Sequence, residues 1–162
     1  MKQSAFISLG ELAPDSSVWD RLVLHLVKLC VGVRDVEHLR SLQRARLATD
    51  PPLRHRTRNS PRRSGELLAG GSLYWVIAGT LRVRQLLLDI VEEPQADGGP
   101  HCVLILDPHL VLVEPRQVKP FQGWRYLDPS AAPPDLPQRR PATGAAQLPR
   151  SLREALAALC LL

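Results

Sequence analysis

The sequence has few cysteines, and their positions exclude several kinds of structure. Cys30, Cys102 and Cys160 lie far apart and never form a Cys-x-x-Cys pair. This spacing argues against a disulfide framework and against a cysteine-ligated zinc site, and it favours a reducing compartment. We therefore expect a cytoplasmic protein.

Several functional signatures are missing as well. No apolar run approaches the roughly 18 residues of a membrane-spanning helix, and the first 22 residues lack the pattern of a secretory signal. There is no Gly-x-Gly-x-x-Gly segment and no Walker loop. In the GGSLY segment, Tyr74 stands where a nucleophile elbow needs its second glycine. The five histidines show no metalloprotease spacing, so we expect no metal. We also expect no cofactor and no membrane partner.

Arginine is the abundant charged residue. The chain of 162 residues carries a net charge of +5, and only Lys2, Lys28 and Lys119 among its 21 basic residues are lysines. A guanidinium group binds phosphate or carboxylate in a two-pronged geometry. The length suits one domain, and the composition therefore favours a single folded unit with an affinity for anions.

The hydrophobic pattern predicts an α+β fold with a bent, mainly antiparallel sheet or partial β-barrel and about three helices. The apolar segment 22–33 indicates a buried strand, and a helix capped by Asp35 follows it. After the prolines at 51 and 52, an extended stretch runs to residue 59. The segment 60–71 indicates a short helix with Ser60 as its cap and Pro61 at its first position.

The second half of the chain reads as successive strands. Residues 72–93 form either one strand interrupted at Gly79 or two strands joined there by a bulge or sharp bend. The segment 101–106 completes a hairpin with it. A turn at Asp107-Pro108 then sends 110–115 back as the next strand of a meander. We expect 121–127 to close the sheet.

Composition divides the chain into four parts. Residues 1–21 form an N-terminal extension, either disordered or upstream of the true start, and residues 22–128 form the core domain. A flexible, proline-rich connection covers 129–149. Residues 150–162 form a C-terminal helix that packs on the core, with Ser151 and Glu154 at capping-box spacing.

The sharpest candidate site is a group of arginines. Arg54, Arg56 and Arg58 alternate along the extended segment and share a face. Arg62 and Arg63 lie in the predicted first turn of the short helix, where free backbone N–H groups favour an anion. The alternative is that Arg62 pairs with Glu66 and that all five arginines are solvated surface.

A second candidate is a pocket near the hairpin. Arg82 and Arg84 share a face with Leu86 and Leu88. The strand is therefore expected to run from a solvent-exposed end, at the arginines, into the core, at the leucines. The predicted register brings Arg84 near Asp107, either as a structural ion pair at the rim or as part of an active site. The aromatic residues are either core residues or a platform for unpaired bases. The complete set of pocket candidates is Tyr74, Trp75, Arg82, Arg84, Asp107, Trp124 and Arg125.

Five segments carry a resemblance to a known family. They are LHLVKLCVGV at 24–33, GGSLYWVIAG at 70–79, the arginine-glutamine pair with LDI at 84–90, ILDP at 105–108 and PFQGWRYL at 120–127. In this order they resemble the domain-of-unknown-function family numbered fourteen eighty-nine, which comprises small bacterial proteins. The resemblance covers residues 23 to about 128 and the final helix. It implies no activity.

Sequence alone therefore favours a binding module for nucleic acid, RNA in particular, or for a phosphate-bearing ligand. A looser analogy with the small β-barrels of PUA-like and ASCH-like modules points the same way, at the level of fold only. Two alternatives stay open: a small enzyme with an Arg/Asp/Trp pocket, and an adaptor that binds another protein through its aromatic strands. The pattern predicts neither the ligand nor the oligomeric state.

Overall fold

The structure, a computed structural model, describes residues 23–94, 100–137 and 152 of the chain. The predicted N-terminal extension, residues 1–21, therefore lies outside the described residues, and so does the predicted C-terminal helix except for Leu152. Residues 129–137, which the composition assigned to a flexible connection, form a short 3-10 helix, η1 (Pro129–Ala131), and a bridge between Val113 and Asp135.

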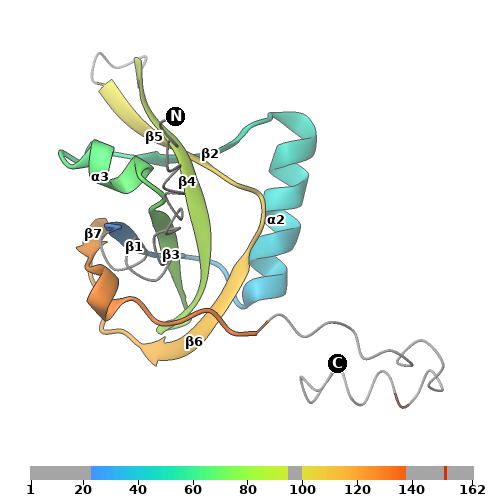
Figure 1. Ribbon diagram of the computed structural model, residues 1–162. Coiled ribbons are helices and arrows are strands. Elements are labelled where there is room, and N and C mark those ends of the chain that lie inside the picture. The colour runs from blue at the N-terminus through green and yellow to red at the C-terminus, as the bar shows by residue number, and fades with distance from the viewer. Residues whose placement is uncertain (1–22, 95–99, 138–151, 153–162) are drawn as a thin grey trace, which may run out of the picture.

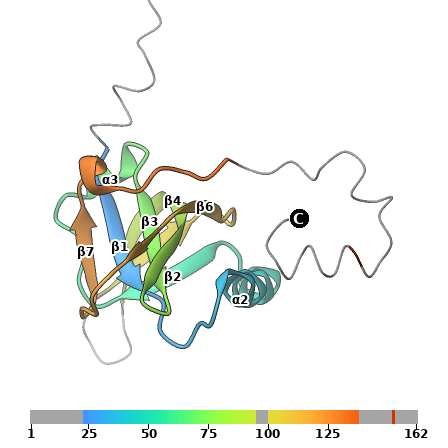
Figure 2. The ribbon, with the colours of Figure 1, turned by 90° about the horizontal axis from the view of Figure 1, so that it is seen from below.

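The described residues form a seven-stranded sheet with the strand order β2-β5-β4-β3-β1-β7, and β6 pairs with β4 beside this path. Its strands are β1 (His25–Leu29), β2 (Leu53–Thr57), β3 (Ser72–Ile77), β4 (Thr80–Pro94), β5 (Pro100–Leu106), β6 (Val111–Gln117) and β7 (Trp124–Leu127). Only the β1–β3 pair is parallel, so the prediction of a mainly antiparallel sheet is confirmed. The sheet is open, with β2 and β7 as its edges, and β7 does not close it (Figure 2).

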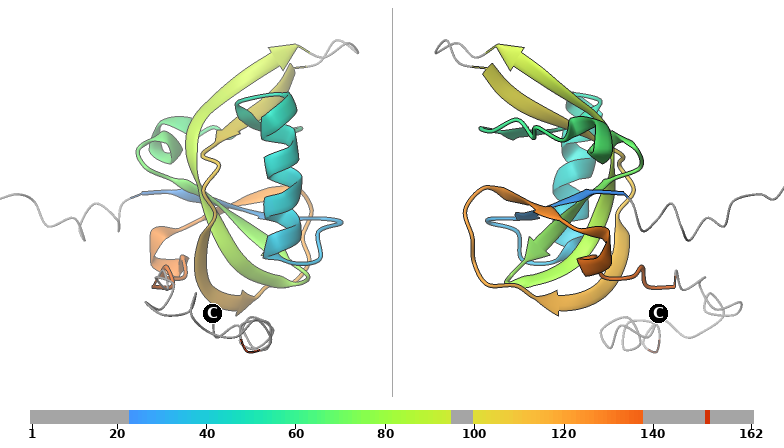
Figure 3. Two further views of the ribbon diagram at one scale, coloured as in Figure 1. Left: turned by 90° about the vertical axis from the view of Figure 1, so that its right-hand side faces the viewer. Right: turned by 60° about the vertical axis from the view of Figure 1, so that its left-hand side comes forward.

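Helix α2 (Val36–Thr49) connects β1 to β2 and covers one face of the sheet (Figures 1 and 3). The carboxylate of Asp35 caps it by accepting a hydrogen bond from the backbone N–H of His38, at 2.7 Å. Leu39 and Gln43 are its buried residues. The local capping signal thus gives the correct start of this helix.

Strand β3 is buried on both faces, because it lies between two groups of core residues. Leu73, Trp75 and Ile77 pack toward α2. Tyr74 and Val76 pack on the opposite face, where residues 118–132 cover the sheet. Such a strand carries apolar residues at every position instead of alternating ones.

A two-residue turn joins β3 to β4. Ala78 and Gly79 both have positive φ angles, 48° and 78°, and Ile77 pairs with Thr80 across the turn. This backbone suits the right-handed twist of an antiparallel hairpin. Of the two alternatives for residues 72–93, two strands joined at Gly79 is therefore the correct one.

Strand β4 is long and bent, and it holds the sheet together (Figure 3). Its first half pairs with β3 and β6, and its second half pairs with β5. Strands β5 and β6 both run antiparallel to β4 and pair with successive parts of it. They therefore follow one another along the same edge of β4, with an interruption at residues 107–110. The chain therefore does not reverse at Asp107-Pro108, and the predicted meander is wrong.

Helix α3 (Ser64–Leu68) is shorter than predicted. It begins after Arg63, and no side chain caps it, so Ser60 and Pro61 lie before the helix. Gly70, with a φ of 112°, follows its end as expected. The described part of the chain holds two α-helices, and neither has the length and apolar character that spanning a membrane requires.

Candidate functional site

A cleft of about 990 Å³ opens between the segment that follows β2 and the edge strand β7. We call it the basic cleft. Its lining comes from β1, from the end of β2 and the residues after it, and from β7 with the turn before it. The lining residues are Lys28, Arg56, Thr57, Arg58, Asn59, Ser60, Arg62, Gln122, Gly123, Trp124 and Tyr126.

Hydrogen bonds hold the two walls of the cleft together. The indole N–H of Trp124 donates to the carbonyl oxygen of Asn59 at 3.0 Å. The backbone N–H of Arg63 donates to the hydroxyl of Tyr126 at 3.2 Å. Trp124 and Tyr126 also pack edge to face, with ring centroids 5.1 Å apart. The cleft is therefore a fixed feature of the fold, formed by segments about 60 residues apart in the chain.

The lining is positively charged. It contains Lys28, Arg56, Arg58 and Arg62, and it contains no carboxylate. Among the described residues, Glu93 lies 3.4 Å from Nη2 of Arg56, whereas Arg58 and Arg62 form no ion pair. Burial lowers the pKa of Lys28, with Cys30 acting in the opposite sense. A bound anion would favour the charged form of this lysine.

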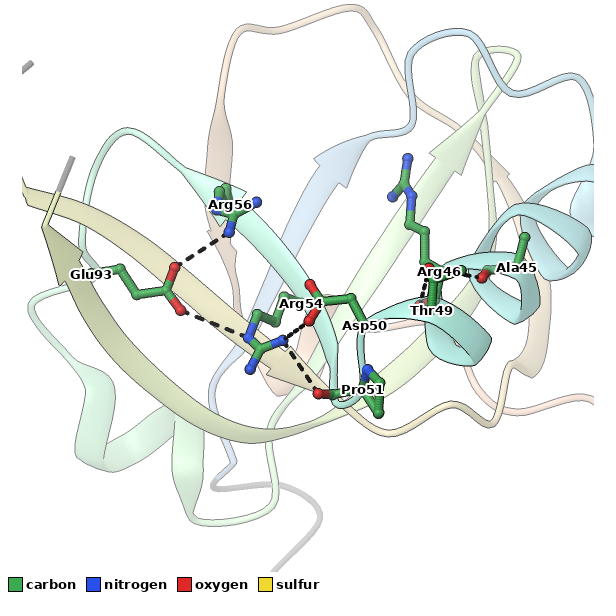
Figure 4. A network of polar contacts seen from close by, with 8 residues as sticks. All are labelled: Ala45, Arg46, Thr49, Asp50, Pro51, Arg54, Arg56 and Glu93. Atoms are coloured by element: carbon green, nitrogen blue, oxygen red, sulfur yellow. Dashed lines mark hydrogen bonds and ion pairs between the residues drawn. The ribbon is translucent and has the colours of Figure 1, made fainter. Parts of the chain in front are cut away.

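Three of the five predicted arginines line the basic cleft: Arg56, Arg58 and Arg62. Arg54 is held elsewhere, since its guanidinium lies 2.8 Å from Asp50 and 3.7 Å from Glu93 (Figure 4). Arg63 binds Glu66, with Nε 2.7 Å from the carboxylate, and its guanidinium lies 5.6 Å from the centroid of the Tyr126 ring.

Two details of the arginine hypothesis are corrected. Glu66 pairs with Arg63 and not with Arg62. Because α3 has five residues and begins after Arg63, neither Arg62 nor Arg63 lies in its first turn, and the helix offers no anion site at its N-terminus. Arg56, Arg58 and Arg62 instead line the basic cleft.

Comparison with protein families matches residues 26–162 to a family described as Protein of unknown function (DUF1489). The chain belongs to the DUF1489 family. The match confirms the resemblance carried by the five sequence segments and the final helix, and it also includes residues 129–149. Neither the curated proteins nor the solved structures contain a match. The analogy with PUA-like and ASCH-like modules therefore stays a prediction for this DUF1489 protein.

The predicted Arg84–Asp107 ion pair does not form. Arg84 binds the carboxylate of Asp135 through Nε and Nη2, at 2.7 and 2.6 Å, and donates to the hydroxyl of Ser72. The backbone N–H of His109 donates to Asp107 at 2.7 Å, and this bond holds the pKa of Asp107 below its usual range. Asp135 lies in the segment that the composition assigned to the connection, so sequence patterns gave no reason to pair it with Arg84.

The other pocket candidates are spread over the DUF1489 fold. Tyr74 and Trp75 are buried on opposite faces of β3, and Arg82 is exposed. The guanidinium of Arg125 lies over the Phe121 ring, 4.7 Å from its centroid. Trp124 alone of the seven lines the basic cleft. These residues do not share one cavity.

The predicted path of β4 is also wrong. Val83, Gln85 and Leu87 face the core, whereas Leu86 and Leu88, which share a face with the arginines, are exposed. One face of the strand thus stays exposed to solvent along this stretch, instead of running from a solvent-exposed end into the core. The alternation along the strand was predicted correctly, but the face that carries the arginines stays exposed at Leu86 and Leu88.

A second cavity of about 360 Å³ lies between α2, β2 and the segment that links β1 to α2. We call it the α2 cavity. Its wall includes His55, whose Nε2 atom is buried without a hydrogen-bond partner. Burial, followed by the charges of Lys28 and Arg46, lowers the pKa of His55 to about 4. Burial also raises the pKa of Cys30 in the same wall to about 11.

Sequence reasoning missed Lys28 as a residue of the cleft and left Tyr126 open between the core and a stacking platform, and it missed the α2 cavity altogether. Lys28 could have been singled out from the sequence, because it is the one charged residue in a strand that is otherwise apolar except for His25.

Within the described part of the chain, no group of three or more His, Cys, Asp or Glu side chains is arranged to hold a metal ion.

Proposed function

We propose that this DUF1489 protein is a binding module for single-stranded nucleic acid, and that the basic cleft is its binding site. The observation that carries the proposal is the cleft's lining of four basic side chains without a carboxylate. A polyanion is the ligand that such a lining attracts, through charge and through bidentate contacts between guanidinium and phosphate.

The aromatic residues favour a single strand over a duplex. Trp124 and Tyr126 stand in the cleft beside the basic side chains. Sites for single-stranded nucleic acid combine a positively charged groove with aromatic rings on which unpaired bases stack. A duplex hides the faces of its bases, and it would gain only the phosphate contacts.

The enzyme alternative has less support. Arg84 and Asp107 bind Asp135 and His109 instead of each other, and of the four residues proposed for the enzyme pocket (Arg84, Asp107, Trp124 and Arg125) only Trp124 lines the basic cleft. The adaptor alternative needs a binding surface on the aromatic strands, but Tyr74 and Trp75 of β3 are buried.

Binding of a labelled, unstructured oligouridine, followed by fluorescence anisotropy at about 0.1 M salt, tests the proposal. The double variant Arg58→Gln, Arg62→Gln removes two cleft charges, and we expect it to weaken binding about tenfold. The matched control is Arg44→Gln, Arg82→Gln, which removes two exposed arginines outside the cleft. We expect the control to bind within about twofold of the wild type. Equal weakening by both variants would show that net charge alone binds the strand.

A further inference from the structure

The α2 cavity adjoins the basic cleft. Lys28 and Arg56 line both, so a molecule bound to these two cations would border both spaces. Figure 4 shows that Arg56 extends from β2 on the side where Glu93 binds it. The cavity has a volume of about 360 Å³, within the range of natural small-ligand pockets.

The sheet register explains the position of Lys28. On one side Lys28 pairs with Trp124 of β7, and on the other side it pairs with Trp75 of β3. Directly paired residues share a face of a sheet, so the lysine stands between the two tryptophans, which are about 10 Å apart. Trp124 lines the basic cleft, and Trp75 lines the α2 cavity.

The wall of the α2 cavity combines apolar surface with an unsatisfied polar group. Leu39, Leu53 and Leu106 contribute the apolar part. The His55 ring packs edge-on against Trp75, with centroids 4.9 Å apart, and its buried Nε2 has no partner. A buried polar atom without a hydrogen bond is costly, and a polar group brought in by a ligand would remove that cost once the ring turned toward it.

We propose that the α2 cavity is a base pocket: one unpaired base of the strand bound in the basic cleft enters it, and the phosphates on either side of that nucleotide bind Lys28 and Arg56. A nucleobase is a flat ring with a polar edge, which suits apolar walls beside an unsatisfied imidazole. The inference rests on the proposed function, because the bound strand supplies the base. A free nucleotide has the same chemistry and is the other source to be tested.

Filling the cavity tests the pocket. Leu42 lines it and is 36% exposed, so Leu42→Trp adds bulk at the cavity without overpacking the core. We expect this variant to bind the oligouridine about tenfold more weakly, the loss of one stacked base. The matched control is Leu88→Trp, because Leu88 is 50% exposed and lines neither cavity. The control should bind like the wild type.

A competition experiment on the wild type needs no variant. Uridine monophosphate should displace the labelled strand about tenfold more effectively than ribose 5-phosphate, which lacks the base. Equal displacement, or unchanged strand binding by a folded Leu42→Trp variant, would overturn the base pocket and leave the proposed function intact.

The affinities for the strand and for uridine monophosphate show whether the base comes from a strand or from a free nucleotide. Strand binding that is much tighter than binding of uridine monophosphate supports a base delivered by the strand. Nucleotide binding that Leu42→Trp weakens, without any binding of the strand, would overturn the proposed function and assign the pocket to a free nucleotide. Absence of binding by both ligands would overturn both proposals.

Discussion

At the scale of single residues, a buried amide connects α2 to the sheet. The Gln85 side chain exchanges two hydrogen bonds with the Gln43 amide, accepts one from the indole N–H of Trp75 and donates one to the carbonyl oxygen of Asp107. Gln85 has no exposed surface, so each of these groups depends on the others for its hydrogen bonds. This network fixes the Trp75 ring in the wall of the α2 cavity.

His55 makes stability depend on pH. Its pKa is about 4 in the folded protein and about 6.5 when unfolded, so between these values the unfolded chain binds the extra proton. Stability therefore rises with pH through this window. Lowering the pH from 7 to below 4 should cost about 3 kcal/mol of unfolding free energy through this residue.

Urea denaturation at several pH values measures this effect. His55→Leu should show a smaller loss of stability on acidification than the wild type, whereas His38→Leu, which removes a half-buried imidazole on α2, should retain the wild-type profile. Parallel pH profiles for wild type and His55→Leu would mean that His55 titrates normally in the folded protein.

At the scale of secondary structure elements, Gly71 lies where the end of α3, the residue before β1 and the start of β3 approach one another closely. Its N–H donates to the carbonyl oxygen of Leu67 at 2.7 Å, and its own carbonyl accepts from Leu87 at 2.9 Å. A Cβ atom at this position would lie against the carbonyl oxygens of Leu67 and Leu24, well inside van der Waals contact. Only glycine fits between these backbone segments.

Gly71→Ala should lower the free energy of unfolding by about 2 to 3 kcal/mol, because backbone atoms must shift to admit the methyl group. Gly65→Ala, in α3, meets nothing within 4 Å and should be neutral or slightly stabilising. Chemical denaturation of the two variants provides the comparison. Equal stabilities would contradict the close approach at Gly71.

Elements marked by local signals were predictable, and those set by distant contacts were not. Asp35 marks the start of α2 through a hydrogen bond three residues away, so the sequence contains the whole signal. The position of β6 depends on its pairing with β4 some 30 residues earlier. Asp107-Pro108 resembles a reversing turn locally. However, β4 pairs with the chain both before this dipeptide, in β5, and after it, in β6, so the chain continues along the same edge of β4.

At the scale of the whole molecule, the candidate site also depends on contacts between distant segments, which the sequence does not reveal. Sequence patterns identified the arginines as the sharpest group, and Arg56, Arg58 and Arg62 do line one cleft. They gave no indication that β7 would pair with β1 and place Trp124 beside Lys28. A cleft between the two edges of an open sheet exists only when the whole sheet has formed.

The salt dependence of strand binding tests the central claim most directly. If Lys28, Arg56, Arg58 and Arg62 each neutralise a phosphate, a plot of log K against log salt should have a slope of about −3 for a single strand. The slope should fall to about −1.5 for Arg58→Gln, Arg62→Gln and stay near −3 for Arg44→Gln, Arg82→Gln. Binding without a salt dependence, or the same slope for all three proteins, would contradict a nucleic-acid site in the basic cleft.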